Sequence, residues 1–323
     1  MQGRSSSTQF WAIVLIGLGV VLLLGSLIPN LWGLLWPLFL VALGLYLLLG
    51  RGRVMFGSPD LKTDRFSAPL AGVTSARVEL GLPVGETDIH TLADAENLID
   101  AELTYVGEID FAVSGEAEKT VRLRQAEGFS WNWLNPANWF SGGPRPRWSI
   151  GLSPHVPMSL SVSGGVGASR LDLRALQVTN LDISTGTGAM SLVMPGVSDG
   201  YQARLSGGVG EMRAEIPDGA TVGLSLSGGV GSVTLQIGAG AAINARITGG
   251  AGRVYVDVPP DAAVRLEAST GLGDIAVPGR FARLSGAEGG VGQSGVWETP
   301  GFAEAARPIA IHFSGGVGGL AVR

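Results

Sequence analysis

A five-residue glycine motif recurs along the second half of this chain and constrains its fold more than any other feature. It reads SGGVG at residues 163–167, and close variants follow at nearly regular intervals. The last glycines of successive copies are separated by 21, 22, 21, 21, 21, 19 and 26 residues. A fixed period of about 20 residues is typical of repeat architectures, in which each unit buries its apolar face against its neighbours. These closing glycines are Gly167, Gly188, Gly210, Gly231, Gly252, Gly273, Gly292 and Gly318.

The residues that follow each closing glycine alternate between apolar and polar side chains. After Gly210 the second, fourth and sixth positions are Met212, Ala214 and Ile216, and polar residues lie between them. This alternation predicts a strand with one buried face. The run before each motif alternates in the same way, and residues 309–322 fit one last coil. We therefore predict a mainly β fold, a flattened β-solenoid with repeats of about 21 residues whose equivalent strands pair in parallel.

The N-terminal region contains two apolar runs without a charged residue. Residues 10–28 and 31–49 are each 19 residues long, enough for a helix to cross a hydrocarbon layer of about 30 Å. Pro29 and Asn30 form a turn between them, so we predict a transmembrane helical hairpin in residues 1–53. A signal peptide is the alternative, but its apolar core would be shorter and no second span would follow. Basic residues flank the hairpin and none lies in the turn, which places both termini in the cytoplasm.

The remaining domain boundaries follow from composition. Residues 54–72 are rich in Gly, Pro, Ser and alternating charges and are predicted to be a linker. Residues 73–323 form the predicted solenoid, with an interruption at 128–148. Before that interruption, strands are predicted at residues 76–80, 98–105, 109–113 and 120–124, as a degenerate part of the same stack.

The interruption at 128–148 reads GFSWNWLNPANWFSGGPRPRW and holds half of the eight Trp residues. Three interpretations stay open: a hydrophobic lid over an end or seam of the stack, a contact with the membrane interface, and a binding surface. Aromatic rings beside Arg suit an anionic headgroup layer. The candidates for partner or membrane contact are Phe129, Trp131, Trp133, Trp139, Phe140, Arg145, Arg147 and Trp148.

The amino-acid composition excludes several kinds of functional site and partner. The chain has no Cys, which excludes disulfides, thiol catalysis and Cys-based zinc sites. Residues 54–323 carry 19 basic and 27 acidic residues, a net charge of −8, which argues against nucleic acid as a partner. The three histidines, His90, His155 and His312, belong to different units and suggest no metal site.

Three motifs that resemble functional sites are better explained by the repeat. Residues 290–295 match GxGxxG, but no amphipathic helix follows to bind a dinucleotide. A calcium β-roll needs Asp two places after the closing glycine, where this chain mostly has apolar residues. The outward positions Asp172, Glu215, Gln236 and Asp257 are predicted to form a solvated polar ladder rather than the carboxylate site of a polysaccharide-cleaving enzyme. We predict no catalytic, cofactor or metal site and no enzymatic activity.

Two parts of the chain resemble known bacterial modules. Residues 17–20 (GLGV), 36–38 (WPL) and 42–46 (ALGLY) resemble the short transmembrane module of LiaI/LiaF-type proteins. Residues 148–154 (WSIGLSP) and the stretch through 181–186 (LDISTG) are similar to the toastrack domain, an adhesin-like β-solenoid.

The resemblance implies a function without catalysis. It implies a multi-pass protein of the bacterial inner (cytoplasmic) membrane that senses or regulates envelope stress through protein contacts. The two apolar spans make the lipid bilayer an expected partner, and the resemblance implies a membrane histidine kinase or other envelope proteins as partners. A homo-oligomer is compatible with the sequence, which does not specify the oligomeric state. The alternative is a structural or adhesive self-assembling module without a signalling role.

Overall fold

A computed structural model of the protein describes residues 61–93, 96–126, 146–197, 199–287 and 292–323. All of them belong to one structural unit, Ser58–Arg323. Within these ranges every regular element is a β-strand, which confirms the predicted mainly β fold, and no helix there is long and apolar enough to cross a membrane. The predicted membrane spans at 10–28 and 31–49 lie outside the described residues.

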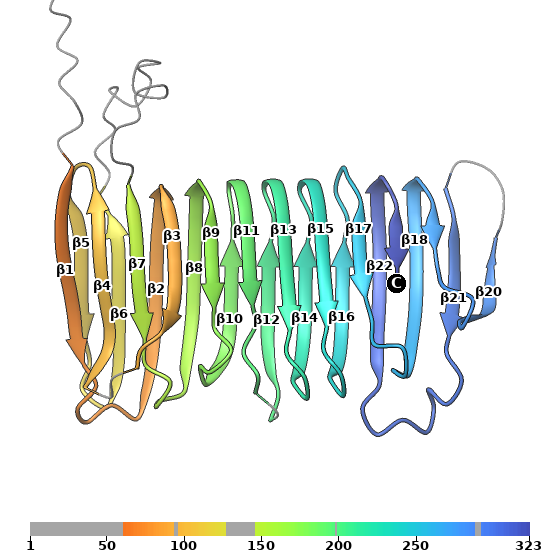
Figure 1. Cartoon of the computed structure of the whole chain (residues 1–323), viewed down its shortest axis with the longest axis horizontal. Helices are drawn as coiled ribbons and strands as arrows, with labels where there is room; N and C mark the ends of the chain where they lie inside the picture. Colours follow the sequence, from red (N-terminus) through yellow and green to blue (C-terminus); the bar gives the residue numbers. More distant parts are fainter. Residues whose placement is uncertain (1–60, 94–95, 127–145, 198, 288–291) are drawn as a thin grey trace, which may run out of the picture. The chain divides into compact units, whose positions relative to one another are not determined.

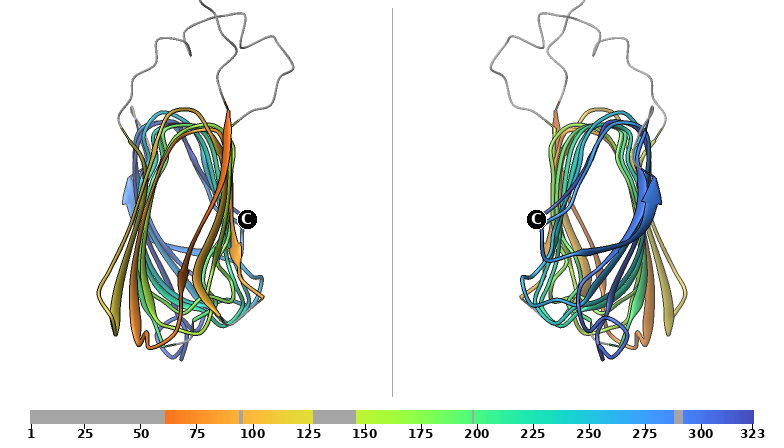
Figure 2. Two further views of the ribbon diagram at one scale, coloured as in Figure 1. Left: turned by 90° about the vertical axis from the view of Figure 1, so that its left-hand side faces the viewer. Right: turned by 90° about the vertical axis from the view of Figure 1, so that its right-hand side faces the viewer.

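The strands form two facing walls of one sheet that wraps into a flattened solenoid (Figures 1 and 2). Each coil consists of a strand of wall A, a glycine corner and a strand of wall B. We call the edge with the glycine corners the corner edge, and the other edge, where the chain passes to the next coil, the return edge.

Wall A contains, in spatial order, β5 (Ile109–Ser114), β6 (Glu118–Gln125), β2 (Ser75–Val84), β8 (Met158–Val166), β10 (Val178–Ser184), β12 (Tyr201–Ser206), β14 (Thr221–Ser227), β16 (Ala242–Thr248), β22 (Ile309–Val317), β18 (Val264–Leu272), β21 (Ser294–Glu298) and β20 (Ala282–Ala287). Wall B contains β1 (Lys62–Pro69), β4 (Asn97–Tyr105), β7 (Arg147–Leu152), β3 (Glu86–Thr91), β9 (Ser169–Asp172), β11 (Thr187–Val193), β13 (Val209–Ile216), β15 (Val230–Ile237), β17 (Val254–Asp257), β23 (Leu320–Val322) and β19 (Ile275–Ala276).

The alternating sequence pattern determines which side chains fill the space between the walls. Equivalent apolar residues of successive coils lie in register, as Ile183, Leu205 and Leu226 do along wall A, and all three are buried. Met212 pairs in parallel with Val233 on wall B, as the spacing from the closing glycines predicts. Full burial of one such aliphatic side chain contributes about 1.5–3 kcal/mol, so the stacked interior rows account for much of the stability.

The order of the coils in space differs from their order in the sequence. The last coil, β22–β23, lies between coil β16–β17 and coil β18–β19, with Ile311 paired to both Ala245 and Leu266. The early coil β2–β3 likewise lies between β6–β7 and β8–β9. Residues 309–322 therefore form a coil, as predicted, but it occupies the interior of the stack.

Both ends of the stack depart from the predicted parallel pattern. β1 lies within the predicted linker at 54–72 and pairs antiparallel with β4, where Arg65 forms an ion pair with Asp100. The linker prediction is wrong for these residues because their alternating charges belong to an exposed edge strand. β4 also pairs antiparallel with β7, and β5 with β6. At the other end, β20 and β21 pair antiparallel within wall A.

Candidate functional site

The glycine motif forms the corner edge through direct backbone contact between coils. Gly188, Gly210 and Gly231 have positive φ values of 143°, 138° and 137°, which side chains disfavour. The amide of Val209 donates to the carbonyl of Gly186 at 2.8 Å, and Val230 donates to Gly208 at 2.9 Å. Because these amides bond the neighbouring coil, they do not point outward as an anion-binding loop requires. The motif is therefore structural.

At the glycine corners of the described coils, including the corner at Gly85, the residue before the glycine lies on the outside of the corner. These residues are paired from coil to coil and form one line along the corner edge. The five valines and one leucine in the line are each 51–56% exposed; among the described residues, Val113 and Leu284 are the other exposed large aliphatic side chains. We call this line the corner row; in spatial order it consists of Val84, Val166, Thr187, Val209, Val230, Ala251, Val317 and Leu272.

The aromatic interruption begins and ends at this same edge. β6 runs toward the corner edge beside β2, and β7 leaves that edge beside β3, so the chain reaches the corner edge at Ala126 and leaves it at Pro146. Pro146 lies against Gly85, where a Cβ would come within 2.6 Å of the Pro146 carbonyl oxygen. Six of the predicted contact residues lie outside the described residues: Phe129, Trp131, Trp133, Trp139, Phe140 and Arg145.

The other two predicted contact residues differ in position. Arg147 is exposed at the start of β7. Trp148 is fully buried, and its indole Nε1 donates to the carbonyl of Val84 at 3.1 Å. Trp148 is thus a core residue that fixes the base of the interruption and cannot contact a partner in the folded domain. Residue type alone does not separate Trp148 from the other Trp residues nearby. The sequence signal that does is the alternation of Trp148, Ile150 and Leu152, which indicates an inward face.

The outward polar ladder of wall B is present. Its residues occupy one line in the order Asp172, Val193, Glu215, Gln236 and Asp257. Val193 and Gln236 separate the carboxylates, so their backbones are roughly 10 Å apart at about 4.8 Å per strand.

Wall A carries a second ladder of alternating charge. Arg122 donates a hydrogen bond of 2.8 Å to Glu79, which holds the pKa of Glu79 below its ordinary value. Farther along, Arg204 lies 3.6 Å from Asp182, and His312 lies 3.2 Å from Glu267. These cross-strand pairs connect neighbouring coils at the surface, where each contributes little to stability.

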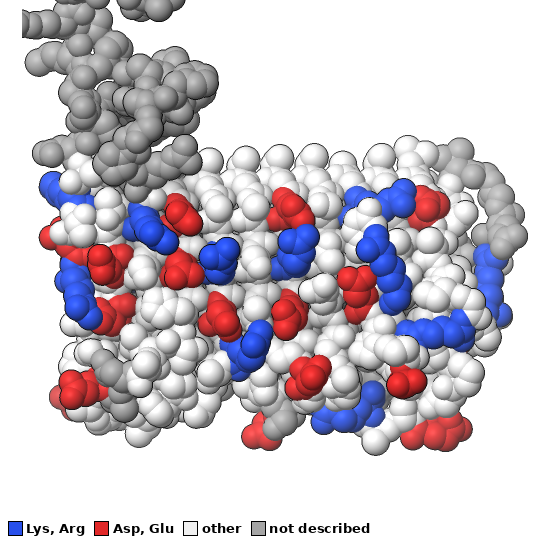
Figure 3. Space-filling model, viewed as in Figure 1, with Lys and Arg blue, Asp and Glu red and all other residues white. Residues whose placement is uncertain are grey.

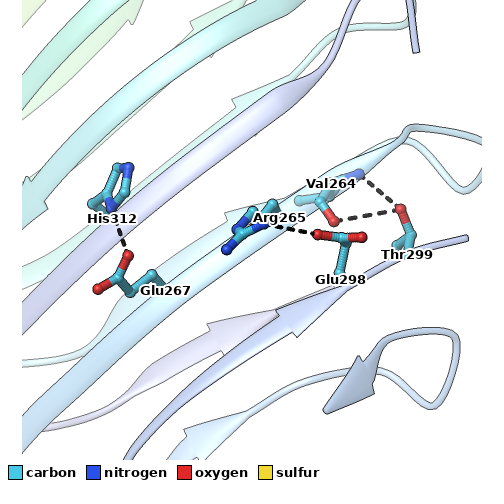
Figure 4. Close-up of polar contacts among 6 residues, drawn as sticks. All are labelled: Val264, Arg265, Glu267, Glu298, Thr299 and His312. Atoms are coloured by element: carbon cyan, nitrogen blue, oxygen red, sulfur yellow. Dashed lines mark hydrogen bonds and ion pairs between the residues drawn. The ribbon is translucent and has the colours of Figure 1, made fainter. Parts of the chain in front are cut away.

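Figure 4 shows this end of wall A, where β18 carries its polar contacts to β22 on one side and β21 on the other. Arg265 reaches Glu298 at 3.2 Å. The buried Thr299 accepts a hydrogen bond from the Val264 amide at 2.7 Å through its Oγ1 atom. These contacts connect the antiparallel strand β21 and the residue after it to coil β18–β19, which indicates a structural role.

The described part of the chain shows neither a metal site nor a dinucleotide-binding fingerprint. No group of three or more His, Asp or Glu residues that could hold a metal ion occurs there. His90 and His312 each pair with one carboxylate, and His155 lies in a separate turn. After the GxGxxG match, residues 294–298 form the strand β21, whereas a dinucleotide fingerprint requires a helix.

These features define a β-solenoid whose distinctive surface is an apolar row along the corner edge. Residues 57–217 match the family described as the N-terminal domain of toast_rack, DUF2154. The match spans the first antiparallel strands and the solenoid as far as β13, and it supports a toastrack β-solenoid domain.

Two solved structures are similar to this chain. One is a proposed cell adhesion protein from Clostridium sporogenes, with 17% identity and a TM-score of 0.37, over 81% of this chain and 99% of that chain. The other is a proposed adhesin from Bacteroides fragilis, with 13% identity and a TM-score of 0.36, over 82% of this chain and 98% of that chain. TM-scores this low do not support a conclusion about this chain. No match was found among the curated proteins.

Proposed function

We propose that this protein is a non-enzymatic β-solenoid anchored in the bacterial inner membrane, with both termini in the cytoplasm. It senses or regulates envelope stress by contacting another membrane protein, in the first instance a histidine kinase. The resemblance of residues 1–49 to the LiaI/LiaF-type module supports the anchor and the kinase, and the toastrack match supports a domain that works through protein contacts.

The observation that carries this proposal is the place where the aromatic interruption joins the solenoid. Its two ends meet at the corner edge, and the buried Trp148 holds the second end against Val84. The chain therefore leaves the solenoid after Gln125 and re-enters it at Arg147 at the edge that also carries the exposed corner row. Aromatic residues and Arg are the types that most often dominate binding at protein interfaces. The remaining candidates are Phe129, Trp131, Trp133, Trp139, Phe140, Arg145 and Arg147.

Cross-linking in the native membrane followed by affinity recovery tests this function. The full chain is compared with a variant in which residues 129–145 are replaced by a short Gly–Ser linker, leaving β6 and β7 intact. We expect the histidine kinase to be recovered with the full chain and lost with the variant. Asp261→Ala combined with Glu304→Ala, two exposed acids on the return edge, serves as the control and should leave recovery unchanged. Equal recovery with all three chains, each with an intact β circular-dichroism spectrum, would refute the contact role of the interruption.

A second function, self-assembly without signalling, is favoured by the open end of wall A. β20 is the outermost strand there, and Leu284 on it is 57% exposed. An exposed edge strand with an apolar side chain can pair with another copy. If this function applies, the detergent-solubilised chain sediments as an oligomer and Leu284→Lys converts it to a monomer. Kinase recovery would then be absent for every variant.

A further inference from the structure

The corner row is a continuous uncharged strip, apolar at every position except Thr187, and not a set of isolated exposed residues. Single exposed aliphatic side chains are ordinary on protein surfaces. Here the eight positions are paired coil to coil, and neighbouring strands lie about 4.8 Å apart, so the strip extends for roughly 34 Å. The residue before each corner-row position is a glycine, except for Pro83 before Val84. A strip of this length marks an interaction surface.

Charge is distributed unequally between the two edges of the solenoid. None of the eight corner-row positions is charged, and Figure 3 shows the rim along this edge as uncharged. The nearest charges lie one residue beyond the closing glycines on wall B, where Arg253 pairs with Asp274 at 3.3 Å and Glu211 with Arg213 at 2.8 Å. The return edge instead carries charges of both signs: the exposed acids Asp199, Asp218, Asp261 and Glu304 and the bases Arg174, Arg280 and Arg307. The corner edge is thus suited to an apolar environment, and the return edge to water.

The chain enters the solenoid at the corner edge. Lys62 at the start of β1 is paired with Tyr105, at the end of β4. β4 runs antiparallel to β7, which begins at the corner edge with Arg147, so Lys62 lies at that edge. Twelve residues, 50–61, separate it from the second predicted membrane span. Such a segment reaches at most about 40 Å and keeps this edge at a high local concentration near the bilayer.

We propose that the corner row rests on the surface of the lipid bilayer, with the solenoid axis parallel to the membrane and the return edge directed away from it. This inference depends on the membrane anchor proposed above. Apolar side chains that reach the boundary between headgroups and acyl chains leave water, and the binding strength grows with the apolar area buried. The acids of the return edge then lie far from anionic headgroups, which would repel them.

A second copy of the chain fits the corner row less well. A stable protein interface buries about 800 Å² on each partner. The corner row is one residue wide, and its six aliphatic side chains are only about half exposed, so it offers less area than this. A fluid lipid surface, by contrast, can adapt to a narrow ridge.

Lipid quenching in reconstituted vesicles tests the proposal. Because the chain has no Cys, a single Cys introduced into the full-length protein can carry an environment-sensitive fluorophore. Three sites share one region of the stack: Val230→Cys in the corner row, Ser225→Cys on the outer face of wall A, and Ala239→Cys on the return edge, all exposed. Each labelled protein is reconstituted into vesicles of phosphatidylethanolamine and phosphatidylglycerol that contain nitroxide-labelled lipid. We expect quenching at Val230 to be several-fold stronger than at Ser225 or Ala239.

The outcomes separate this inference from the proposed function. Equal quenching at the three sites, or strongest quenching at Ser225 or Ala239, would overturn the orientation while leaving kinase recovery unaffected. Energy transfer between copies labelled at Val230, without lipid quenching, would identify a second copy as the occupant and also overturn the proposal. A chain that fails to float with the vesicles would overturn the anchor and the orientation together. Val209→Asp combined with Val230→Asp should abolish quenching of a label at Val166→Cys if the row contacts lipid, and unchanged quenching contradicts that contact.

Discussion

Gly208 lies so close to Gly186 of the neighbouring coil that a Cβ atom on Gly208 would be 1.8 Å from the Gly186 carbonyl oxygen. The adjacent Gly207 differs, because its Cβ would approach the flexible end of Met212 at 3.2 Å and backbone atoms only at the ordinary contact distance of 3.5 Å. Two glycines next to each other in one motif therefore have different roles. Gly208 sets the spacing between coils, and Gly207 does not.

Gly208→Ala should accordingly destabilise the solenoid by about 3 kcal/mol, since backbone of two coils must separate to admit the methyl group. Gly207→Ala is the matched control, and its effect should be below about 1 kcal/mol. Chemical denaturation of the full-length protein in detergent, followed by circular dichroism, measures both. Equal stability of the two variants would show that the corner does not depend on close backbone contact.

The interior position of the last coil gives a prediction about local stability. In a stack that follows chain order, the C-terminal strand would lie at an end and would fray first. Because β22 pairs with both β16 and β18, the amides of His312 and Phe313 should exchange with deuterium as slowly as that of Leu205 in the central coils. Exchange of the amides in β20, an edge strand, should be much faster. Fast exchange in β22 would contradict the interior placement.

Tyr105 predicts a loss of stability at alkaline pH. Its hydroxyl donates a hydrogen bond of 2.5 Å to Asp64, and this bond raises the pKa of Tyr105 from an ordinary value of 10.0 to about 12. Between these two values the unfolded chain loses the proton while the folded chain keeps it, so stability falls as the pH rises from 10 to 12.

Tyr105→Phe should remove this contribution and flatten the alkaline pH dependence of the unfolding free energy. Burial also raises the pKa of Tyr201, so the comparison of wild type with the variant isolates Tyr105. Denaturation curves across this pH range provide the measurement. Parallel pH profiles for the two proteins would count against the hydrogen bond to Asp64.

Trp148 should affect stability without taking part in contacts. Trp148→Phe keeps an aromatic ring in the core but removes the hydrogen bond to the Val84 carbonyl, at a cost of about 1 kcal/mol. Trp148→Ala should cost about 3–5 kcal/mol. The Phe variant should still recover the kinase in the cross-linking experiment, in contrast with replacement of residues 129–145. Loss of recovery with a folded Phe variant would assign Trp148 a contact role after all.

The regular part of the fold is readable from the sequence because the same physical pattern is repeated. The glycine spacing and the alternation after each glycine predict that Met212, Val233 and Val254 share one interior line, and the strand pairing confirms this. The corner row carried a signal as well, since nearly every residue before a closing glycine is apolar. That signal is hard to separate from the strand pattern until burial is known.

The order of the coils could not be predicted from that pattern. Coils such as β16–β17 and β18–β19 present similar apolar interior lines, so the sequence does not specify which coil β22–β23 adjoins. The position of β1 was missed because an exposed edge strand has no continuous buried face: Ala68 is buried, whereas Thr63 and Arg65 are exposed. The hydrogen bond of Trp148 could not be predicted either, because its partner Val84 lies 64 residues away in the sequence.

We propose that the anchored protein contacts the lipid bilayer through its corner edge. Thiol accessibility tests it most directly, with Val230→Cys and Ala239→Cys compared in membrane fragments that admit a water-soluble reagent to both sides. We expect Ala239→Cys to react fully with the reagent, whereas Val230→Cys is protected in membranes and becomes reactive in detergent. Equal reactivity of the two sites in the membrane would contradict it.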